Sequence, residues 1–484
     1  MARETKLIDQ CLSEIFKNFI ALKDDDLKRS QEVFKGVFDK VKKAMENQCN
    51  YFKKYSRQVL YAGSVYDGLK VSKLDEFDMD IVIRLPISYA DNENGIIIEN
   101  DEPGFVKLII TKGFDDLVKS SDWHRCQEVT ASWRDKDKIY FLQSKFRFWM
   151  KSVFIKALNQ LNNEVVVNGV RYLLKYQESG PAFTLNVSND VNNEEFKLDV
   201  DLVPAIKFNL PRWPKGYKQI EDARVTDWLV VPKPRKAIHD PDLRDRCWRL
   251  SFQEFEREML KDCQNVKICI RLVKKLRDIL GMKSIASYYI KTVFLWKIHT
   301  VSEKKYWKNK LSFLYPIMVK EVYEAIKKKN IPYFWYADYN LLESVKPHLL
   351  PKYEEQLKNV LDNITNVKCI ITSLLTSKEI EIFKGMHIYV KILNNTNGNI
   401  ESSTFNIPSN AESNDSKEVG DEIVTVYNVL DKKIEELTER LDQLEKKFEE
   451  KINGKLKYEH TSIKCNAQQI TIYMTSLLSQ TDYY

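Results

Sequence analysis

The sequence predicts an α+β fold with two lobes: a mixed β-sheet core braced by an N-terminal helical region, then a helical C-terminal lobe. Three observations support this prediction. Apolar residues recur at helical spacing over residues 1–59, and short alternating runs typical of strands occur within residues 60–245. Helical periodicity then returns over residues 246–393.

The first region, residues 1–59, has the pattern of an amphipathic spine helix. Its apolar positions include Val33, Val37 and Val41, and the one glycine, Gly36, costs a helix interior about 1 kcal/mol. The polar face is basic and carries Lys35, Lys40, Lys42, Lys43, Lys53, Lys54 and Arg57. Such a face is either an ordinary solvated surface or a phosphate-binding ridge.

The core region, residues 60–245, contains the strand signals. The segment Glu76–Leu85 places acidic residues on one face and apolar residues on the other, as a half-buried strand does. Further strands are expected over residues 165–205, in the runs VVVNGVRYLL and FKLDVDLVPAI. In the C-terminal lobe, Val266–Leu280 shows the clearest 3.6-residue period.

Composition restricts the class of protein. The length of 484 residues allows two or three domains. Hydrophobic residues make up 43% of the chain, which is enough for buried cores. The net charge of +7 is modest and identifies no partner by itself. The eight cysteines are scattered without a CxxC pair, so we expect neither a disulfide framework nor a structural zinc. We also expect a cytoplasmic protein without membrane segments, because no signal sequence is visible and Lys291 and Lys297 interrupt the most apolar run.

After residue 393 the composition changes. Residues 394–420 are rich in Asn, Ser and Glu and predict a disordered linker. Residues 421–455 then carry an apolar seam with alternating steps of four and three, which predicts a short coiled coil and, through it, self-association or binding of a signalling partner. A single amphipathic helix docked on the body is the alternative. Residues 456–484 form a tail.

Three carboxylates and a glycine-serine pair suggest a catalytic site. Glu76 and Asp78 stand two residues apart on one strand, so their side chains leave the same face roughly 7 Å apart at the backbone. Asp201, from a neighbouring strand, would complete a site for two Mg²⁺ or Mn²⁺ ions about 3.5–4 Å apart. Gly63 and Ser64 offer a turn where backbone N–H groups and a hydroxyl can approach phosphate oxygens.

Each part of this pattern is weak alone, because acidic strand faces are common in solvent. Glu76, Asp78 and Asp80 on one face would nevertheless repel one another unless a cation offset their charge. Asp80 and Asp199 share the relevant faces, so the choice of ligands within each strand stays open.

Several motifs in order resemble the cyclic GMP–AMP synthase family, and most closely the insect-type cGAS-like receptors. They are GSVYDGLKVSKLDEFDMDIVIRL, VDLVPAI, CWRLSF and SYYIKT, and the resemblance covers roughly residues 1–393. It implies a bilobal nucleotidyltransferase fold, with Glu76, Asp78 and Asp201 as metal ligands and catalytic residues. The residues that it implies for nucleotide binding are Gly63, Ser64, Arg249, Lys274, Ser287 and Tyr288.

Among these residues, Gly63 and Ser64 would grip the triphosphate, and Lys274 and Ser287 would hold phosphates. Tyr288 would stack on a base, and Arg249 would pack on a base or bond to it. Without the resemblance, Tyr288 would be read as one more core aromatic residue.

The resemblance also implies a function. The chain would bind double-stranded RNA and make a cyclic GMP–AMP type dinucleotide from ATP and GTP, activating STING-type antiviral signalling. Residues 253–267 contain Cys263 but no histidine, so the zinc insertion of the vertebrate DNA sensor is absent. Ala62 and Gln253 replace small hydroxyl residues, which leaves the base choice and the linkage open. The alternatives are a linear oligonucleotide synthase resembling 2′-5′ oligoadenylate synthases and a non-catalytic nucleic-acid-binding scaffold.

Duplex RNA would be read mainly by shape and backbone, so basic side chains on rigid helices are the expected contacts. Solubility is the competing explanation for any single lysine. The candidate contacts on the spine and on the helix around Lys274 are Lys40, Lys42, Lys43, Lys53, Lys54, Arg57, Arg271, Lys275 and Arg277, and the segment Lys304–Lys310 adds more.

Overall fold

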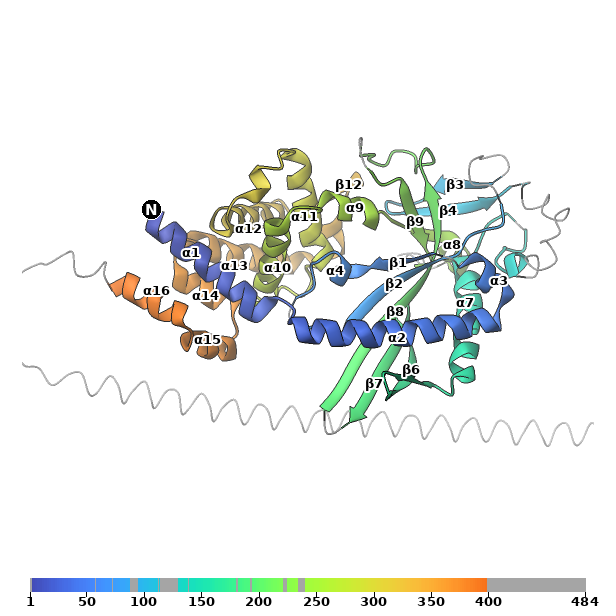
Figure 1. Ribbon diagram of the computed structural model, residues 1–484. Coiled ribbons are helices and arrows are strands. Elements are labelled where there is room, and N and C mark those ends of the chain that lie inside the picture. Colours follow the sequence, from blue (N-terminus) through green and yellow to red (C-terminus); the bar gives the residue numbers. More distant parts are fainter. Residues whose placement is uncertain are drawn as a thin grey trace, which may run out of the picture. The chain divides into compact units, whose positions relative to one another are not determined.

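A computed structural model gives the fold, and Figure 1 labels its elements. It describes residues 2–56, 58–71, 73–87, 95–111, 113, 129–137, 139–179, 182–191, 194–220, 224–233 and 240–397. In this part of the chain a large mixed sheet and a set of helices share one contiguous hydrophobic core. The predicted α+β class is therefore confirmed.

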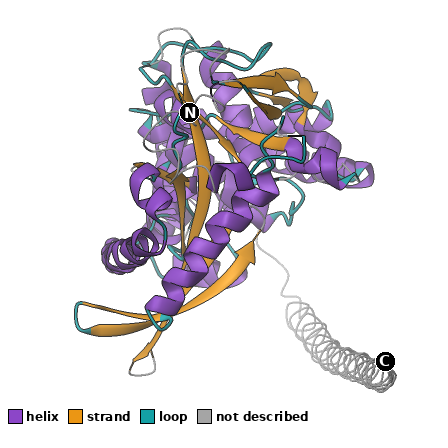
Figure 2. Ribbon diagram, turned by 90° about the vertical axis from the view of Figure 1, so that its right-hand side faces the viewer, coloured by secondary structure: helices purple, strands orange, loops and turns teal. Residues whose placement is uncertain are grey.

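Ten strands form the large sheet, in the order β3-β4-β10-β9-β8-β7-β6-β5, with β2 paired to β8 and β1 paired to β2. Their bounds are β1 (Gln58–Ala62), β2 (Glu76–Val82), β3 (Ile96–Asn100), β4 (Phe105–Ile110), β5 (Glu164–Val167), β6 (Val170–Ser179), β7 (Ala182–Val191), β8 (Glu194–Asn209), β9 (Asp227–Val231) and β10 (Cys247–Ser251). The long strands β7 and β8 cross α2 and extend beyond it (Figures 1 and 2).

The pair β2·β8 is parallel, whereas the other paired strands described here are antiparallel, which makes the sheet mixed. The register places Asp78 opposite Asp201 and Glu76 opposite Asp199. On the other face of β2, Phe77 and Met79 are fully buried. The alternation read from the sequence therefore has its physical cause in a strand with one face in the core and one face toward the site.

The N-terminal helical region has several segments rather than one long spine. They are α1 (Ala2–Ile15), a π-helical turn (Phe16–Ile20), α2 (Asp24–Gln48) and α3 (Asn50–Tyr55). Ala21 and Lys23 have extended backbone angles, and this breaks the helix. As a result α1 packs on the helical lobe, whereas α2 packs on α7 (Gln143–Gln160) and the sheet.

Helices dominate the C-terminal part, with a small hairpin of β11 (Pro332–Tyr333) and β12 (Tyr336–Asn340) among them. The helices that complete the described fold are α4 (Gly63–Tyr66), α8 (Pro241–Arg246), α9 (Gln253–Met259), α10 (Gln264–Ile279), α11 (Ser287–Thr300), α12 (Leu311–Lys327), α13 (Leu350–Asp362), α14 (Val367–Leu374), α15 (Ser377–Lys384) and α16 (His387–Asn397), and the short 3₁₀ turns are Tyr306–Lys308, Leu341–Ser344 and Pro347–Leu349. Among the helices described, none combines the length and apolar character needed to cross a bilayer.

The structure corrects several predicted boundaries. Residues 58–59, predicted as part of the helical region, begin β1, and residues 394–397, predicted as the start of the linker, end α16. The helical lobe was expected to begin at residue 246, but Cys247–Ser251 is strand β10, which pairs with β4 and β9. Trp248 is fully buried at this place, so the segment belongs to the sheet. Four predictions lie outside the described residues: Arg57, the linker beyond residue 397, the coiled coil at 421–455 and the tail at 456–484.

Candidate nucleotidyltransferase site

The three predicted carboxylates meet at one place. Glu76, Asp78 and Asp201 each offer an oxygen, and these oxygens lie within 4.8 Å of one another. The parallel pairing of β2 with β8 sets Asp78 beside Asp201, and Glu76 projects from the same face two residues earlier. We call these three residues the acidic cluster. Its hard oxygen donors, all partly buried, fit divalent cations such as Mg²⁺.

The electrostatics of the cluster also fit a cation. Burial, together with the charges of Glu76 and Asp201, raises the pKa of Asp78 to about 6. Burial also raises the pKa of Asp201, although the hydrogen bond from Thr184 opposes the shift. Carboxylates whose ionised forms disfavour one another are stabilised by a bound cation, because the cation offsets their repulsion.

Asp199 and Asp80 were alternative metal ligands in the sequence pattern, and the structure separates both from the acidic cluster. Asp199 accepts a hydrogen bond from Asn186 at 2.7 Å and is not part of the cluster. Asp80 is 5% exposed and accepts a hydrogen bond from Gln253 at 2.6 Å. Burial raises the pKa of Asp80 to about 7, against the effect of that hydrogen bond.

Gly63 lies directly against the cluster. Its φ of +72° is in the left-handed region that glycine adopts at little cost, and it begins α4. A Cβ at this position would lie 1.6 Å from Asp78 Oδ2, so a larger residue could not fit without moving the carboxylate. The requirement for glycine therefore has both a conformational and a steric reason.

A central cavity of about 430 Å³ opens beside the cluster. Strands supply Asp78, Val203 and Val231 to its wall, and α9, α10 and α11 supply the opposite side. All the predicted nucleotide-binding residues line it: Gly63, Ser64, Arg249, Lys274, Ser287 and Tyr288. These residues come from segments up to 225 positions apart in the sequence, between Gly63 and Tyr288, and the fold brings them to one place. The volume is within the range of about 300–1,000 Å³ that small-molecule sites have.

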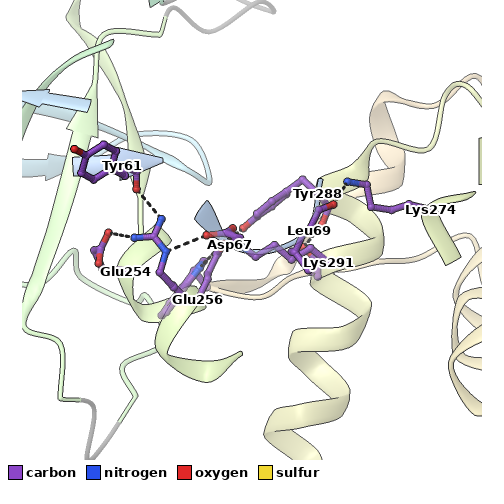
Figure 3. A network of polar contacts seen from close by, with 11 residues as sticks. Tyr61, Asp67, Leu69, Glu254, Glu256, Lys274, Tyr288 and Lys291 are labelled. Carbon is purple, nitrogen blue, oxygen red and sulfur yellow. Dashed lines mark hydrogen bonds and ion pairs between the residues drawn. The ribbon is translucent and has the colours of Figure 1, made fainter. Parts of the chain in front are cut away.

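The Tyr288 side chain is held in place by its hydroxyl group. This group donates to Glu256 Oε1 at 2.8 Å, and Trp335 Nε1 donates to the same oxygen at 2.9 Å. Glu256 Oε2 pairs with Lys291 Nζ at 2.8 Å, and Lys291 pairs in turn with Asp67 Oδ2 at 2.7 Å. Figure 3 shows this chain of contacts, which fixes the Tyr288 ring at the cavity wall.

The same network joins the two lobes. Asp67 directly follows α4, and its Oδ1 accepts from Arg257 Nε on α9 at 3.1 Å. Lys274 on α10 donates to the backbone oxygen of Leu69 at 2.7 Å (Figure 3). Burial, and then the charge of Arg277, lowers the pKa of Lys274 to about 8. The glycine-serine turn is thus tied to the helices that carry Lys274 and Tyr288.

Sequence reasoning missed part of this site. Lys291 was noted only as a charge that interrupts an apolar run, and that interruption was the available signal. Lys70 was also missed: its ammonium lies 3.2 Å from Glu76 and 3.0 Å from Asp75. Ser287 was predicted, and the structure adds that Arg277 donates to its hydroxyl at 2.9 Å.

The predicted RNA contacts divide into two groups. Lys275 and Arg271 do not fit a docking surface: Lys275 is 8% exposed and pairs with Glu379 at 2.7 Å, and the Arg271 guanidinium packs over the Phe16 ring at 4.3 Å. Both hold α10 against neighbouring helices. Arg277 contacts Asp278 and Ser287.

The remaining basic candidates are closer to the surface. Lys43 and Lys53 are exposed, Lys42 pairs with Glu46 at 2.8 Å, and the exposed Lys40 donates to the Val166 backbone oxygen at 2.6 Å. Lys54, with Arg84 and Lys207, lines a second cavity of about 440 Å³. In the segment Lys304–Lys310 of the helical lobe, called the lobe segment, the exposed lysines are Lys304, Lys305, Lys308 and Lys310.

Comparison with known proteins agrees with this geometry. Residues 65–262 match the Mab-21 protein nucleotidyltransferase domain, and residues 265–359 match the Mab-21 protein HhH/H2TH-like domain. A Cyclic GMP-AMP synthase-like receptor from Ctenocephalides felis is 30% identical over 399 residues, which cover 79% of this chain and 90% of that protein. A protein of the same name from Tribolium castaneum is 32% identical over 388 residues, 77% of this chain and 93% of that protein. The chain therefore belongs to the Mab-21 nucleotidyltransferase family and, within it, to the cyclic GMP-AMP synthase-like receptors.

Proposed function

We propose that this chain joins nucleoside triphosphates at the acidic cluster, using two Mg²⁺ or Mn²⁺ ions. The observation that carries the proposal is the convergence of Glu76, Asp78 and Asp201 beside a cavity of nucleotide size. Two divalent ions at such a site would activate the attacking hydroxyl and neutralise charge on the leaving pyrophosphate. The protein's own contribution is to hold the ligands and both nucleotides in one geometry.

The acidic cluster and the predicted nucleotide-binding residues have separate roles in this proposal. Glu76, Asp78 and Asp201 hold the metal ions, and Lys70 keeps Glu76 oriented. Gly63 and Ser64 receive the triphosphate, and Lys274 and Ser287 contact phosphates. Tyr288 stacks on a base with its hydroxyl fixed by Glu256, and Arg249 bonds to a base or packs on it.

The product that we propose is a cyclic GMP–AMP type dinucleotide, made from ATP and GTP in two steps. The name that the relatives carry, Cyclic GMP-AMP synthase-like receptor, supports this choice. The first step would make a linear dinucleotide, and the second would close it into a ring. The proposal includes a cytoplasmic location, where ATP, GTP and Mg²⁺ are available, and STING-type antiviral signalling by the product.

Double-stranded RNA is the activator that we propose. The support is the set of lysines on α2, α3 and the lobe segment, of which Lys43, Lys53 and the lysines at 304, 305, 308 and 310 are exposed. RNA duplexes bind such surfaces through phosphates, so activation should weaken as salt rises. Charge reversal at Lys43, Lys53 and Lys54 should flatten this salt dependence. Unchanged activation by the triple variant would place the docking surface elsewhere.

The test of the enzyme proposal is product identification. Purified protein is incubated with ATP, GTP, Mg²⁺ or Mn²⁺ and a panel of DNA and RNA duplexes, and products are separated before and after phosphatase treatment. A ring has no terminal phosphate to remove, so its elution does not change. A phosphatase-sensitive product would instead indicate a linear oligonucleotide synthase.

Two carboxylate variants provide a matched comparison. Asp78→Asn should abolish product, because it removes one ligand from the acidic cluster. Asp199→Asn, two residues before Asp201 on β8, should keep most of the activity. Equal activity in both variants would contradict the site assignment. A wild-type protein that binds duplex RNA but makes no metal-dependent product would support the scaffold alternative.

Self-association through residues 421–455 is a separate proposal, supported by the apolar heptad seam. Light scattering of the full chain and of a chain ending at residue 397 tests it. The molar mass measured for the full chain should exceed the mass of a single chain. A monomeric full chain at micromolar concentration would contradict this proposal.

A further inference from the structure

Asp80 is a buried carboxylate that the metal site does not use. It lies two residues beyond Asp78 on the same strand face, lines the central cavity and is 5% exposed. Within the described residues it makes one hydrogen bond, in which Gln253 Nε2 donates to Oδ2 at 2.6 Å. No cation pairs with it in that part of the chain. A buried carboxylate usually has more partners than this, so the remaining oxygen Oδ1 can accept from a molecule bound in the cavity.

The pair formed by Asp80 and Gln253 presents a defined pattern to the cavity. In the structure Gln253 directs its Nε2 toward the Asp80 carboxylate, which accepts, and the amide oxygen Oε1 is left for another partner. Both residues line the cavity. Apart from the second N–H of Gln253, the pair therefore offers acceptors only, Asp80 Oδ1 and Gln253 Oε1.

The surroundings of this pair suit a flat ring with a polar edge. Val203 lies opposite Asp80 in the register of β2 and β8, and Val231 is a further apolar residue of the wall. Tyr288 adds an aromatic ring to the same cavity. Apolar contact and stacking are available for the faces of a base, and the two acceptors are available for its edge.

We propose that Asp80 and Gln253 together recognise a guanine base. Among the common bases, guanine alone has two adjacent N–H donors on its Watson–Crick edge, at N1 and at the 2-amino group. Adenine and cytosine each place a donor beside an acceptor, and uracil has a single N–H between two carbonyl groups. This inference rests on the proposed function, because it assigns the base of one of the two nucleotides in that same cavity.

Inosine triphosphate is the probe, since it differs from GTP only in lacking the 2-amino group. The wild-type protein should prefer GTP over inosine triphosphate by about ten- to a hundredfold, as expected when a buried acceptor loses its donor. To obtain this ratio, the affinities for non-hydrolysable analogues of the two nucleotides are measured by calorimetry in the presence of Mg²⁺. The ratio of kcat/KM at fixed ATP provides a second readout.

Asp80→Asn changes the pattern without changing the size of the side chain. Whichever way the two amides orient, the Asn–Gln pair presents one donor and one acceptor, which is the complement of adenine. The preference for GTP over inosine triphosphate should fall to about threefold or less, and the preference for GTP over ATP should fall or reverse. Gln253→Met, which removes the amide, should also reduce the preference for GTP over inosine triphosphate. It provides the test if the Asp80 variant does not fold.

Asp227→Asn is the matched control, because Asp227 pairs with Lys207 on another part of the sheet and does not line the central cavity. It should keep the wild-type ratios. Variants at Asp80 and Gln253 that keep the wild-type GTP preference would overturn the inference. A wild-type protein that makes no nucleotide product would overturn the proposed function instead, and the affinity ratios would still test base recognition.

Discussion

Substituting Gly63 by alanine tests whether the geometry of the acidic cluster depends on this residue. Alanine at a φ of +72° costs about 1–2 kcal/mol of backbone strain. In addition, its Cβ would lie 1.6 Å from Asp78 Oδ2 and 2.4 Å from Asp78 Cγ, far inside van der Waals contact. Backbone strain is local, but this clash must move the Asp78 carboxylate away from Glu76 and Asp201.

Gly169→Ala is the matched control for the strain. Gly169 has a φ of +79°, and nothing lies within 4 Å of the Cβ that alanine would add. Both variants should therefore lose a similar free energy of unfolding, about 1–2 kcal/mol, in chemical denaturation. Only Gly63→Ala should lose metal-dependent activity, by at least about a hundredfold, which corresponds to ~2.7 kcal/mol of transition-state stabilisation.

The assays are Mn²⁺ affinity by calorimetry, nucleotidyl transfer under activating conditions, and denaturant unfolding. We expect weak Mn²⁺ binding in Gly63→Ala and wild-type binding in Gly169→Ala. If Gly63→Ala binds Mn²⁺ and turns over as well as Gly169→Ala, the reasoning is refuted. Asp78 would then have room to move without leaving the cluster.

Two further predictions concern buried lysines. Since the pKa of Lys274 is lowered to about 8, nucleotide binding should favour its charged form, and affinity for a triphosphate should fall as pH rises from 7 to 9. Lys274→Met should bind more weakly at pH 7 with a flatter pH profile in calorimetry, and an unchanged profile would exclude Lys274 from phosphate contact. Lys291→Met leaves Asp67 and Glu256 without their shared buried cation and should cost about 3–5 kcal/mol in denaturant unfolding. The control Lys384→Met, whose pair with Glu381 is exposed, should unfold nearly as the wild type does, and equal losses in both variants would contradict the structural role of the network.

Much of the site could be predicted from sequence because its strand signal is local. A two-residue alternation with Phe77 and Met79 on one face and acids on the other requires only a strand with one buried side. The α10 prediction succeeded for the same reason, since Val266 and Val273 follow the helical period and are buried. Motif resemblance then supplied the cavity residues, which periodicity alone does not distinguish from core residues.

The break after the π-helical turn and the placement of β10 in the sheet were not predictable in this way. Cys247–Ser251 is short and apolar, and short apolar runs fit either a strand or a buried helix. The burial of Lys275 was equally unpredictable from local sequence patterns. Its charge predicts an exposed position, and only the approach of Glu379 from α15 offsets the cost of burying it.

The sequence by itself determined the residue types of the acidic cluster, the need for a glycine beside it and the periodicity of the elements that carry them. Tertiary structure decided how the candidate acids on β2 and β8 separate, because the parallel register sets Asp78 beside Asp201, and packing of α9 leaves Asp80 against Gln253. It also decided that Asp67, Glu256 and Lys291 join two lobes. Contacts between residues about 190 to 220 positions apart are properties of packing, and no local pattern encodes them.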